Sequence, residues 1–311
     1  MDYAGIIKRS WQITWKYRVL WLFGLFAGGI SGSFSGSGAQ GDSGTISGDL
    51  SGLERQVERG ADAFVRWFTD NLGIAVAVVL IMSVAGFALW VISIAAQGGL
   101  VKLASEADQD RPVLGSEGWA IGFRYWGRTL LIQLVLTLPF AVLIGALVAA
   151  TIISFIPAMT SDGDPVTAAL GGVAMVCGVF AIAIPLTFVL AFVVGSVYLL
   201  ALRYGILEDR PSFAAIGAAW GAFKARWKQV FGMWLALMLV GIIYGMLAAV
   251  IAVGFVLPAG VAFMAGNLPM SAALILLLAL VMLLPNAIYA ALRSTAWTVF
   301  FRRLTGVAEV V

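Results

Sequence analysis

The chain has 311 residues, of which 61% are hydrophobic and only 11% are charged, and its mean hydropathy is +1.00. Soluble domains carry about 25% charged residues, so this composition excludes a water-soluble protein and indicates one that lies largely in lipid. The formal net charge of +3 is too small to suggest a nucleic-acid partner. The chain has no histidine and a single cysteine, Cys177, which excludes histidine-ligated haem, His/Cys zinc sites and histidine-based catalysis.

Six apolar stretches are predicted to be membrane-spanning helices, since about 20 apolar residues cross the hydrocarbon. The first is short, and the helix-like stretch before it, with Trp11 and Trp15, could extend it. The fourth contains Pro185, and the sequence is compatible both with one helix and with a helix broken at this proline. We therefore predict an all-α fold, a polytopic transmembrane helical bundle of about six spans. In chain order the stretches cover approximately residues 19–30, 72–101, 129–156, 166–202, 230–257 and 270–301.

The basic residues are distributed unevenly between the two sides of these spans. Sixteen of the 19 lie in the N-terminal arm, in the loops after the second and fourth spans, or at the C-terminal end, whereas the opposite loops contain only Arg55, Arg59 and Arg66. The positive-inside rule therefore predicts that both termini are cytoplasmic, which requires an even number of spans. We expect residues 1–311 to form one multi-pass integral domain of the cell (plasma) membrane, and the Gly/Ser tract 31–52 to form a flexible external loop.

Two segments that each precede a pair of spans share a motif. Residues 110–124 read DRPVLGSEGWAIGFR and residues 209–224 read DRPSFAAIGAAWGAFK. Both contain Asp-Arg-Pro, two glycines four residues apart, and a phenylalanine followed by a basic residue. The N-terminus looks like a degenerate third copy. We therefore predict three approximate repeats, each a cytoplasmic amphipathic elbow helix followed by a helical hairpin, over residues 1–107, 108–207 and 208–306.

Aromatic and basic residues recur in the three elbow segments. In the third copy Phe213, Ile216, Trp220, Phe223 and Trp227 are spaced by three or four, which places all five on one face of a helix. Such a helix is expected to lie along the inner leaflet, with its rings at headgroup depth and its bases near anionic lipid. Two roles stay open: elbows that orient the hairpins, or a collar that docks a partner or senses lipid. The candidate surface consists of Trp11, Trp15 and Lys16 in the first copy, Trp119, Phe123 and Arg124 in the second, and Phe213, Trp220, Phe223, Lys224 and Trp227 in the third.

The opening of the chain also carries a family resemblance. Its first 30 residues contain YAGIIKRSWQITWKYRVLWLFGLFAGG. They resemble the opening of uncharacterised prokaryotic membrane proteins that are grouped with the membrane domain of glycerophosphoryl diester phosphodiesterase, and the Asp-Arg-Pro elbows and three hairpins fit that pattern over most of the chain. The resemblance implies a membrane module. The phosphodiesterase chemistry belongs to a separate soluble domain that uses histidine, and this chain has neither, so no functional residue is carried over.

Few polar residues enter the apolar stretches. Arg293 lies nine residues before Arg302, about 13 Å deeper along a helix, and Asn286 lies two turns before Arg293 on nearly the same face. Gln97 and Gln133 lie in or near the second and third spans. A charge in hydrocarbon costs about 2.5–3.5 kcal/mol, so Arg293 is expected to face other helices or a wet cavity, or to extend toward the inner leaflet. It either satisfies backbone carbonyls or contacts an anion or lipid phosphate.

No acidic residue lies in the middle of a predicted span, which argues against a proton-driven carrier. The sequence also lacks a phosphate-binding loop motif and a metal-ligand cluster, so we expect no enzymatic activity, no cofactor and no bound metal. The favoured function is a membrane scaffold or accessory subunit that binds a partner or lipid. The alternative is a transporter of a small solute, an anion or a lipid, with a central cavity near Asn286 and Arg293. The expected partners are anionic inner-leaflet lipids and a membrane protein, not nucleic acid, and the oligomeric state is left open.

Overall fold

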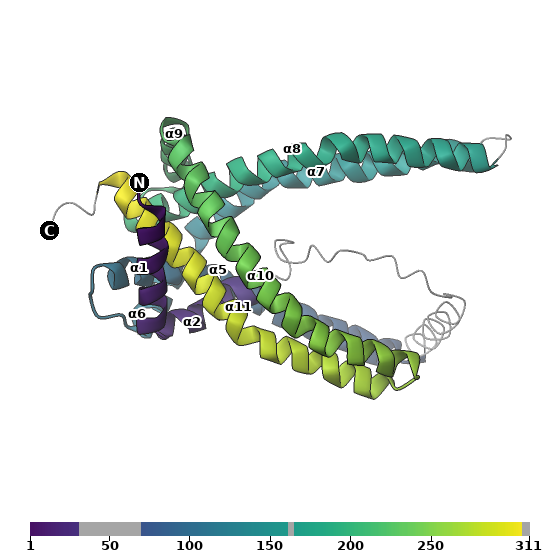
Figure 1. The fold of residues 1–311 in the computed structure, drawn as a ribbon, viewed down its shortest axis with the longest axis horizontal. Coiled ribbons are helices and arrows are strands. Elements are labelled where there is room, and N and C mark those ends of the chain that lie inside the picture. The colour runs from purple at the N-terminus through teal and green to yellow at the C-terminus, as the bar shows by residue number, and fades with distance from the viewer. Residues whose placement is uncertain (31–69, 161–164, 307–311) are drawn as a thin grey trace.

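The structure, a computed structural model, describes residues 1–30, 70–160 and 165–306 (Figure 1). Every regular element in these ranges is a helix, so the predicted all-α fold class is confirmed. The external loop predicted over residues 31–52 lies outside the described residues. In chain order the elements are α1 (Tyr3–Lys16), α2 (Val19–Gly24), the π-helix η1 (Leu25–Ile30), α5 (Leu72–Asp108), α6 (Gly115–Arg124), α7 (Trp126–Thr160), α8 (Pro165–Leu207), α9 (Ser212–Ala225), α10 (Trp227–Met264) and α11 (Leu268–Thr305).

Five helices, α5, α7, α8, α10 and α11, are long and apolar enough to cross a membrane, and they indicate a multi-pass membrane protein. The first predicted span corresponds to α2 and η1. These elements have six residues each and would together reach about 18 Å, against the ~30 Å of the hydrocarbon core. Tyr17 and Arg18 separate them from α1, so α1 does not extend this span. Five of the six predicted spans therefore correspond to helices with the length and composition that crossing a membrane requires, and the sixth stays a prediction.

The long helices continue through their prolines. α8 runs from Pro165 to Leu207 with Pro185 inside it, so the fourth apolar stretch is one helix. α10 likewise continues past Pro258, and α11 past Pro285. A proline inside a helix removes one backbone donor, which membrane helices tolerate where neighbouring groups satisfy the freed carbonyl.

The helices diverge from one end of the molecule (Figure 1). The hairpin of α7 and α8 extends in one direction, whereas α5, α10 and α11 extend in another. At the common end α1, α2, α6 and α9 pack against the adjoining ends of α5, α8 and α11. We call this end the helical junction. The start of α1 and the end of α11 both lie there.

The buried core is concentrated at the helical junction. Its largest fully buried side chains include Trp297, Phe300 and Phe301 of α11, Phe23 of α2 and Leu103 of α5. By contrast, α5 is exposed at every described side chain from residue 72 to residue 90, and α11 is mostly exposed from residue 268 to residue 286. A helical segment of about 19 residues is ~28 Å long, close to the ~30 Å thickness of the hydrocarbon core. These exposed apolar arms therefore have the length and character that lipid contact requires.

Glycine allows α6 to approach α5 closely. A Cβ atom added to Gly122 would lie only 2.2 Å from the backbone oxygen of Ala95, and Gly118 is buried on the same side of α6. This pair therefore lies at a backbone contact, which small residues four apart allow. The glycines at the corresponding motif positions of α9, Gly217 and Gly221, have no such neighbour within 4 Å.

A second pair of glycines lies where α2 and η1 meet α11. A Cβ atom added to Gly24 would lie 2.2 Å from the backbone oxygen of Ala287, and one added to Gly28 would lie 2.2 Å from the Cβ of Ala290. Small residues on both partners therefore bring this short segment against the last span.

The two motif copies predict opposite effects for the same substitution at matched positions. Gly122→Ala should lower the free energy of unfolding by about 2 kcal/mol, because the new Cβ meets backbone that cannot move aside. Gly221→Ala should raise it by about 0.5–1 kcal/mol, because alanine restricts the unfolded chain and meets nothing in the folded one. Unfolding in detergent micelles, followed by tryptophan fluorescence, measures both. Equal effects of the two substitutions would contradict the close contact between α5 and α6.

Candidate functional site

An ion-pair network ties α1 to α5 and α11 at the helical junction. Asp108, the last residue of α5, accepts a hydrogen bond from Arg302 of α11, and its second carboxylate oxygen lies 3.5 Å from Nε of Arg9 of α1. The side chains of Asp108 and Arg302 are only 13% and 10% exposed. Asp110 is exposed and pairs with Arg9 at 2.8 Å and with Lys16 at 3.0 Å. Two carboxylates at the end of one span therefore hold two other helices.

Basic residues lower the pKa of two carboxyl groups near the ends of the spans, those of Asp110 and Asp209. Hydrogen bonds from Arg9 and Lys16 hold the pKa of Asp110 below its ordinary value, and a hydrogen bond from Arg128 lowers the pKa of Asp209. The pKa of Lys16 is raised by its hydrogen bond to Asp110. Because each carboxyl has a lower pKa in the folded chain than in the unfolded one, its stabilising effect is present at neutral pH. It is lost only as the pH falls through the folded-state pKa, below the ordinary value of 3.8.

The two Asp-Arg-Pro segments end their spans in the same way. Asp110 and Asp209 have φ angles of 54° and 52°, the left-handed conformation that terminates a helix and that aspartate adopts more readily than most residues. The proline two positions later cannot continue the helix. Asp209 pairs with Arg128 of α7 at 2.8 Å, and Arg128 also donates to the backbone oxygen of Gly205 at 2.9 Å. Each motif aspartate thus forms the turn and binds a base from another helix.

The candidate polar residues inside the spans are used in separate pairs. Oδ1 of Asn286 accepts a hydrogen bond from the hydroxyl of Tyr244, which ties α11 to α10. Oε1 of Gln97 accepts a hydrogen bond from the hydroxyl of Tyr198 at 2.6 Å, which ties α5 to α8. Oε1 of Gln133 is buried and has no hydrogen-bond partner among the described residues. Within those ranges no hydrogen bond or ion pair joins any two of the four candidates, Asn286, Gln97, Gln133 and Arg293.

A different arginine lies in the core near Arg293. Arg203 of α8 is fully buried, whereas Arg293 is exposed. Arg203 donates to the backbone oxygens of Leu199 at 2.5 Å and Ser294 at 2.9 Å, so it joins α8 to α11. In the sequence, Arg203 is one of the basic residues that follow the fourth predicted span. Its one distinguishing signal is that it follows an unbroken apolar run, which is equally typical of an ordinary helix end.

The predicted elbow residues divide between the surface and the core. α9 ends at Ala225, so Trp227 begins α10 instead of continuing α9. Phe223 is buried, and the ring of Trp119 packs 4.8 Å from that of Phe23. The exposed members are the aromatic residues Trp11, Trp15, Phe123, Phe213, Trp220 and Trp227, and the bases Lys16, Arg124 and Lys224. The Lys224 ammonium lies 5.5 Å from the centre of the Trp220 ring, within reach of a cation–π interaction.

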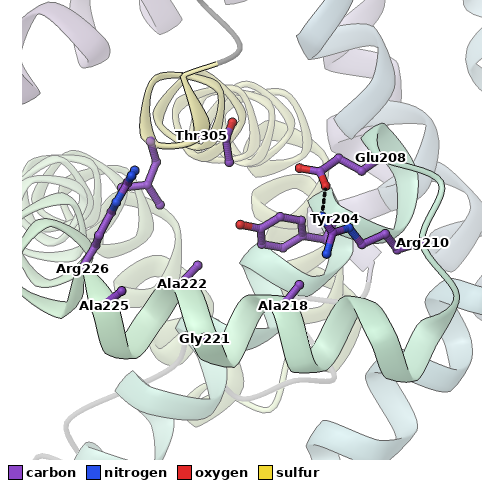
Figure 2. Close-up of a pocket in the computed structure, with 10 residues that line it drawn as sticks. Tyr204, Glu208, Arg210, Ala218, Gly221, Ala222, Ala225, Arg226 and Thr305 are labelled. Carbon is purple, nitrogen blue, oxygen red and sulfur yellow. Dashed lines mark ion pairs between the residues drawn. The ribbon is translucent and has the colours of Figure 1, made fainter.

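A cavity of 540 Å³ opens at the helical junction, between α9 and the ends of α8 and α11. Figure 2 shows Arg226 on one side of it and Tyr204, Glu208 and Arg210 on the other. Small residues of α9 line it between these two sides, and Thr305 of α11 closes it opposite α9. No sequence motif indicates this cavity, because its polar residues come from three separate segments: the end of α8, the residue between α9 and α10, and the end of α11.

Neither metal chemistry nor a relative suggests a function for these features. In the part of the chain that the structure describes, no group of three or more Cys, Asp and Glu side chains could hold a metal ion. Comparison with protein-family models, curated proteins and solved structures finds no match for this chain. The resemblance to the glycerophosphoryl diester phosphodiesterase membrane domain therefore stays a prediction.

The loss of the Asp108 charge should weaken the folded state far more than the loss of the Asp209 charge. Asp108→Asn leaves the buried guanidinium of Arg302 without a carboxylate, and breaking one partner of a buried pair costs about 3–5 kcal/mol. Asp209→Asn breaks a pair whose carboxylate side chain is 65% exposed, which is worth at most about 1 kcal/mol. Unfolding of the two variants and the wild type in the same detergent measures the difference. Similar losses in both variants would show that the Asp108 network is not the main tie between the helices.

Proposed function

We propose that this chain is a multi-pass protein of the cell membrane that acts as a scaffold or accessory subunit, without enzymatic activity. In this proposal the helical junction and both termini lie on the cytoplasmic side. Three helical hairpins leave the junction, with α1, α6 and α9 as the elbow helices that precede them. The exposed rings and bases of the elbows bind a partner protein or the anionic lipids of the inner leaflet.

The observation that carries the proposal is the separation of the packed core from the apolar arms. Buried aromatic residues and the Asp108 network lie at the junction, whereas the arms of α5 and α11 expose apolar side chains for about the thickness of the hydrocarbon. A protein built in this way has one packed end and long lipid-facing helices. The helices would anchor the protein in the membrane, and the packed end would hold a partner at the membrane surface, as a scaffold does.

The arrangement around the two Asp-Arg-Pro segments supports the repeat. In both, a left-handed aspartate lies two residues after the end of a span, a short helix follows, and a single residue separates that helix from the next span. The separating residue is Tyr125 between α6 and α7 and Arg226 between α9 and α10. The first elbow, α1, is also followed by a short break and an apolar helix.

The hydrogen bonds of the intramembrane polar residues favour the scaffold over the transporter. Asn286 and Gln97 each accept a hydrogen bond from a tyrosine of a neighbouring helix, which is the use expected of polar residues that join spans. Arg293 is exposed and is not bonded to either of them in the described structure. A central substrate site would instead bring such groups together.

Topology is tested with single cysteines in a Cys177→Ala background. Ala265→Cys lies between α10 and α11, and Ala4→Cys lies on α1, and both positions are exposed. In right-side-out membranes, a membrane-impermeant maleimide should label Ala265→Cys directly and Ala4→Cys only after permeabilisation. The reverse pattern, or labelling of both positions from one side, would contradict the proposed orientation.

The scaffold role is tested by substitution of the exposed rings at the third elbow. The double variant with Trp220→Ala and Trp227→Ala is cross-linked in native membranes and purified by affinity. Recovery of a stoichiometric partner should fall roughly 30-fold relative to the wild type, as loss of a residue worth about 2 kcal/mol of binding free energy implies. The matched control is Trp90→Ala, another exposed tryptophan, which lies on α5 away from the elbows. Unchanged recovery from the double variant would count against docking at this elbow. Substrate flux in proteoliposomes that contain the purified chain alone would favour the transporter.

A further inference from the structure

The hydroxyl group of Tyr204 opens onto the cavity beside α9. Tyr204 is only 9% exposed, because its ring packs edge-on against Phe301 at 4.8 Å. Its hydroxyl makes no hydrogen bond to the described residues, and Figure 2 shows that it points into the cavity. The hydroxyl is therefore free to donate a hydrogen bond to a ligand in the cavity.

Two arginines lie on either side of this hydroxyl. Across the cavity, the guanidinium of Arg226 forms no ion pair or hydrogen bond with any described side chain or backbone group (Figure 2). On the Tyr204 side, Arg210 pairs with Glu208 at 2.7 Å and lies 5.1 Å from the centre of the Tyr204 ring. Arg210 therefore neutralises the one carboxylate of the cavity, and the charge of Arg226 is left in excess.

The floor of the cavity leaves room for a ligand. It is lined by Ala218, Gly221, Ala222 and Ala225, all small residues of α9. A Cβ atom added to Gly221 would meet nothing within 4 Å. A volume of 540 Å³ is larger than a phosphate group needs and also accommodates what is attached to it.

We propose that this cavity binds a phosphate group, held by the Arg226 guanidinium on one side and the Tyr204 hydroxyl on the other. A tetrahedral phosphate has acceptor oxygens in several directions, so it can accept from both walls at once, and arginine offers it a forked pair of donors. The phosphate belongs either to the headgroup of an anionic phospholipid or to a molecule in the aqueous phase. The lipid source rests on the proposed function, in which this end of the molecule faces the inner leaflet. The aqueous source does not.

The test uses the full chain, purified in a neutral detergent and a phosphate-free buffer. The probes are dihexanoyl phosphatidylglycerol and inorganic phosphate, each titrated separately and in competition, with binding measured by native mass spectrometry and by calorimetry. Gly221→Leu fills the cavity without a change of charge, and Arg226→Gln removes the free guanidinium. Both should weaken binding at least tenfold, since a charge-assisted hydrogen bond or the space itself is lost.

Two matched controls separate the cavity from general effects. Gly217→Leu places the same side chain on α9 at a position outside the cavity that also has nothing within 4 Å, and Arg303→Gln removes an exposed arginine of the last turn of α11. Both should bind the probe like the wild type. Melting temperatures of all four variants establish that they are folded, and if Gly221→Leu is destabilised, the comparison of Arg226→Gln with Arg303→Gln decides.

Each outcome has a distinct meaning. Saturable phosphatidylglycerol binding that excess inorganic phosphate does not displace, and that the two cavity variants lose, supports the site with lipid as the source. Binding of inorganic phosphate with the same dependence on the variants supports the site with an aqueous source. Failure of both probes to bind, or equal loss in Arg303→Gln and Arg226→Gln, overturns the proposal. None of these results alters the partner recovery measured with the Trp220 and Trp227 variants, so the two proposals fail independently.

Discussion

Asp108 joins three helices that are separated by most of the chain. It binds Arg302, 194 residues further on, and lies beside Arg9, whose guanidinium also donates to the Asp108 backbone oxygen across 99 residues. One carboxylate between two guanidinium groups would leave excess positive charge, and Asp110 supplies the second carboxylate where Arg9 and Lys16 need it. The positions of α1, and of the α2–η1 segment that follows it, relative to the last span therefore depend on a polar contact at the base of the spans. The short segment can then reach α11 through its glycines, where close backbone approach replaces the packing of large side chains.

The apolar arms cannot fix the relative positions of the helices. Lipid tails are as apolar as the side chains of the spans, so there is no hydrophobic driving force for the helices to associate. The polar contacts between the spans are accordingly local. They include the Tyr244–Asn286 and Tyr198–Gln97 hydrogen bonds and, at the junction, the buried Arg203, which bonds to a backbone oxygen of α11. Beyond these contacts the α7–α8 hairpin diverges from α10 and α11 (Figure 1). The same physical rule explains why the aromatic core lies at one end. Only there do short helices that are not spans, α1, α6 and α9, cover the span ends on several sides at once.

Hydropathy and length predicted the five long helices, because a lipid environment demands long apolar runs whatever the tertiary contacts are. Features that depend on tertiary contacts were not predictable in the same way. Arg203 and Arg293 look alike in sequence, each near the junction end of a span, yet one is fully buried and the other is exposed, because the helix faces that carry them meet different neighbours. The spacing of the aromatic residues suggested one helix through Trp227, but local backbone geometry breaks the helix at Arg226. The cavity could not be predicted for a further reason. Its polar groups, Tyr204 and Arg226, lie on either side of α9 in the sequence, and they line one cavity only in the folded chain.

The two Asp-Arg-Pro copies have the same turn but different packing, and this difference accounts for the cavity. In the second copy Gly122 brings α6 onto the backbone of α5, which leaves no space between them. In the third copy the small residues buried on α9 are Ala215 and Ala219, so the motif glycines face away from this contact and Gly221 lines open space. The residue that ends each elbow helix differs as well: Tyr125 ends α6 and lies under the guanidinium of Arg128, whereas Arg226 ends α9 with its own guanidinium free. A motif that fixes the turn therefore leaves the face of the following helix unspecified. In the second copy the elbow helix packs directly against a span, whereas in the third copy a charged cavity lies at the end of the spans.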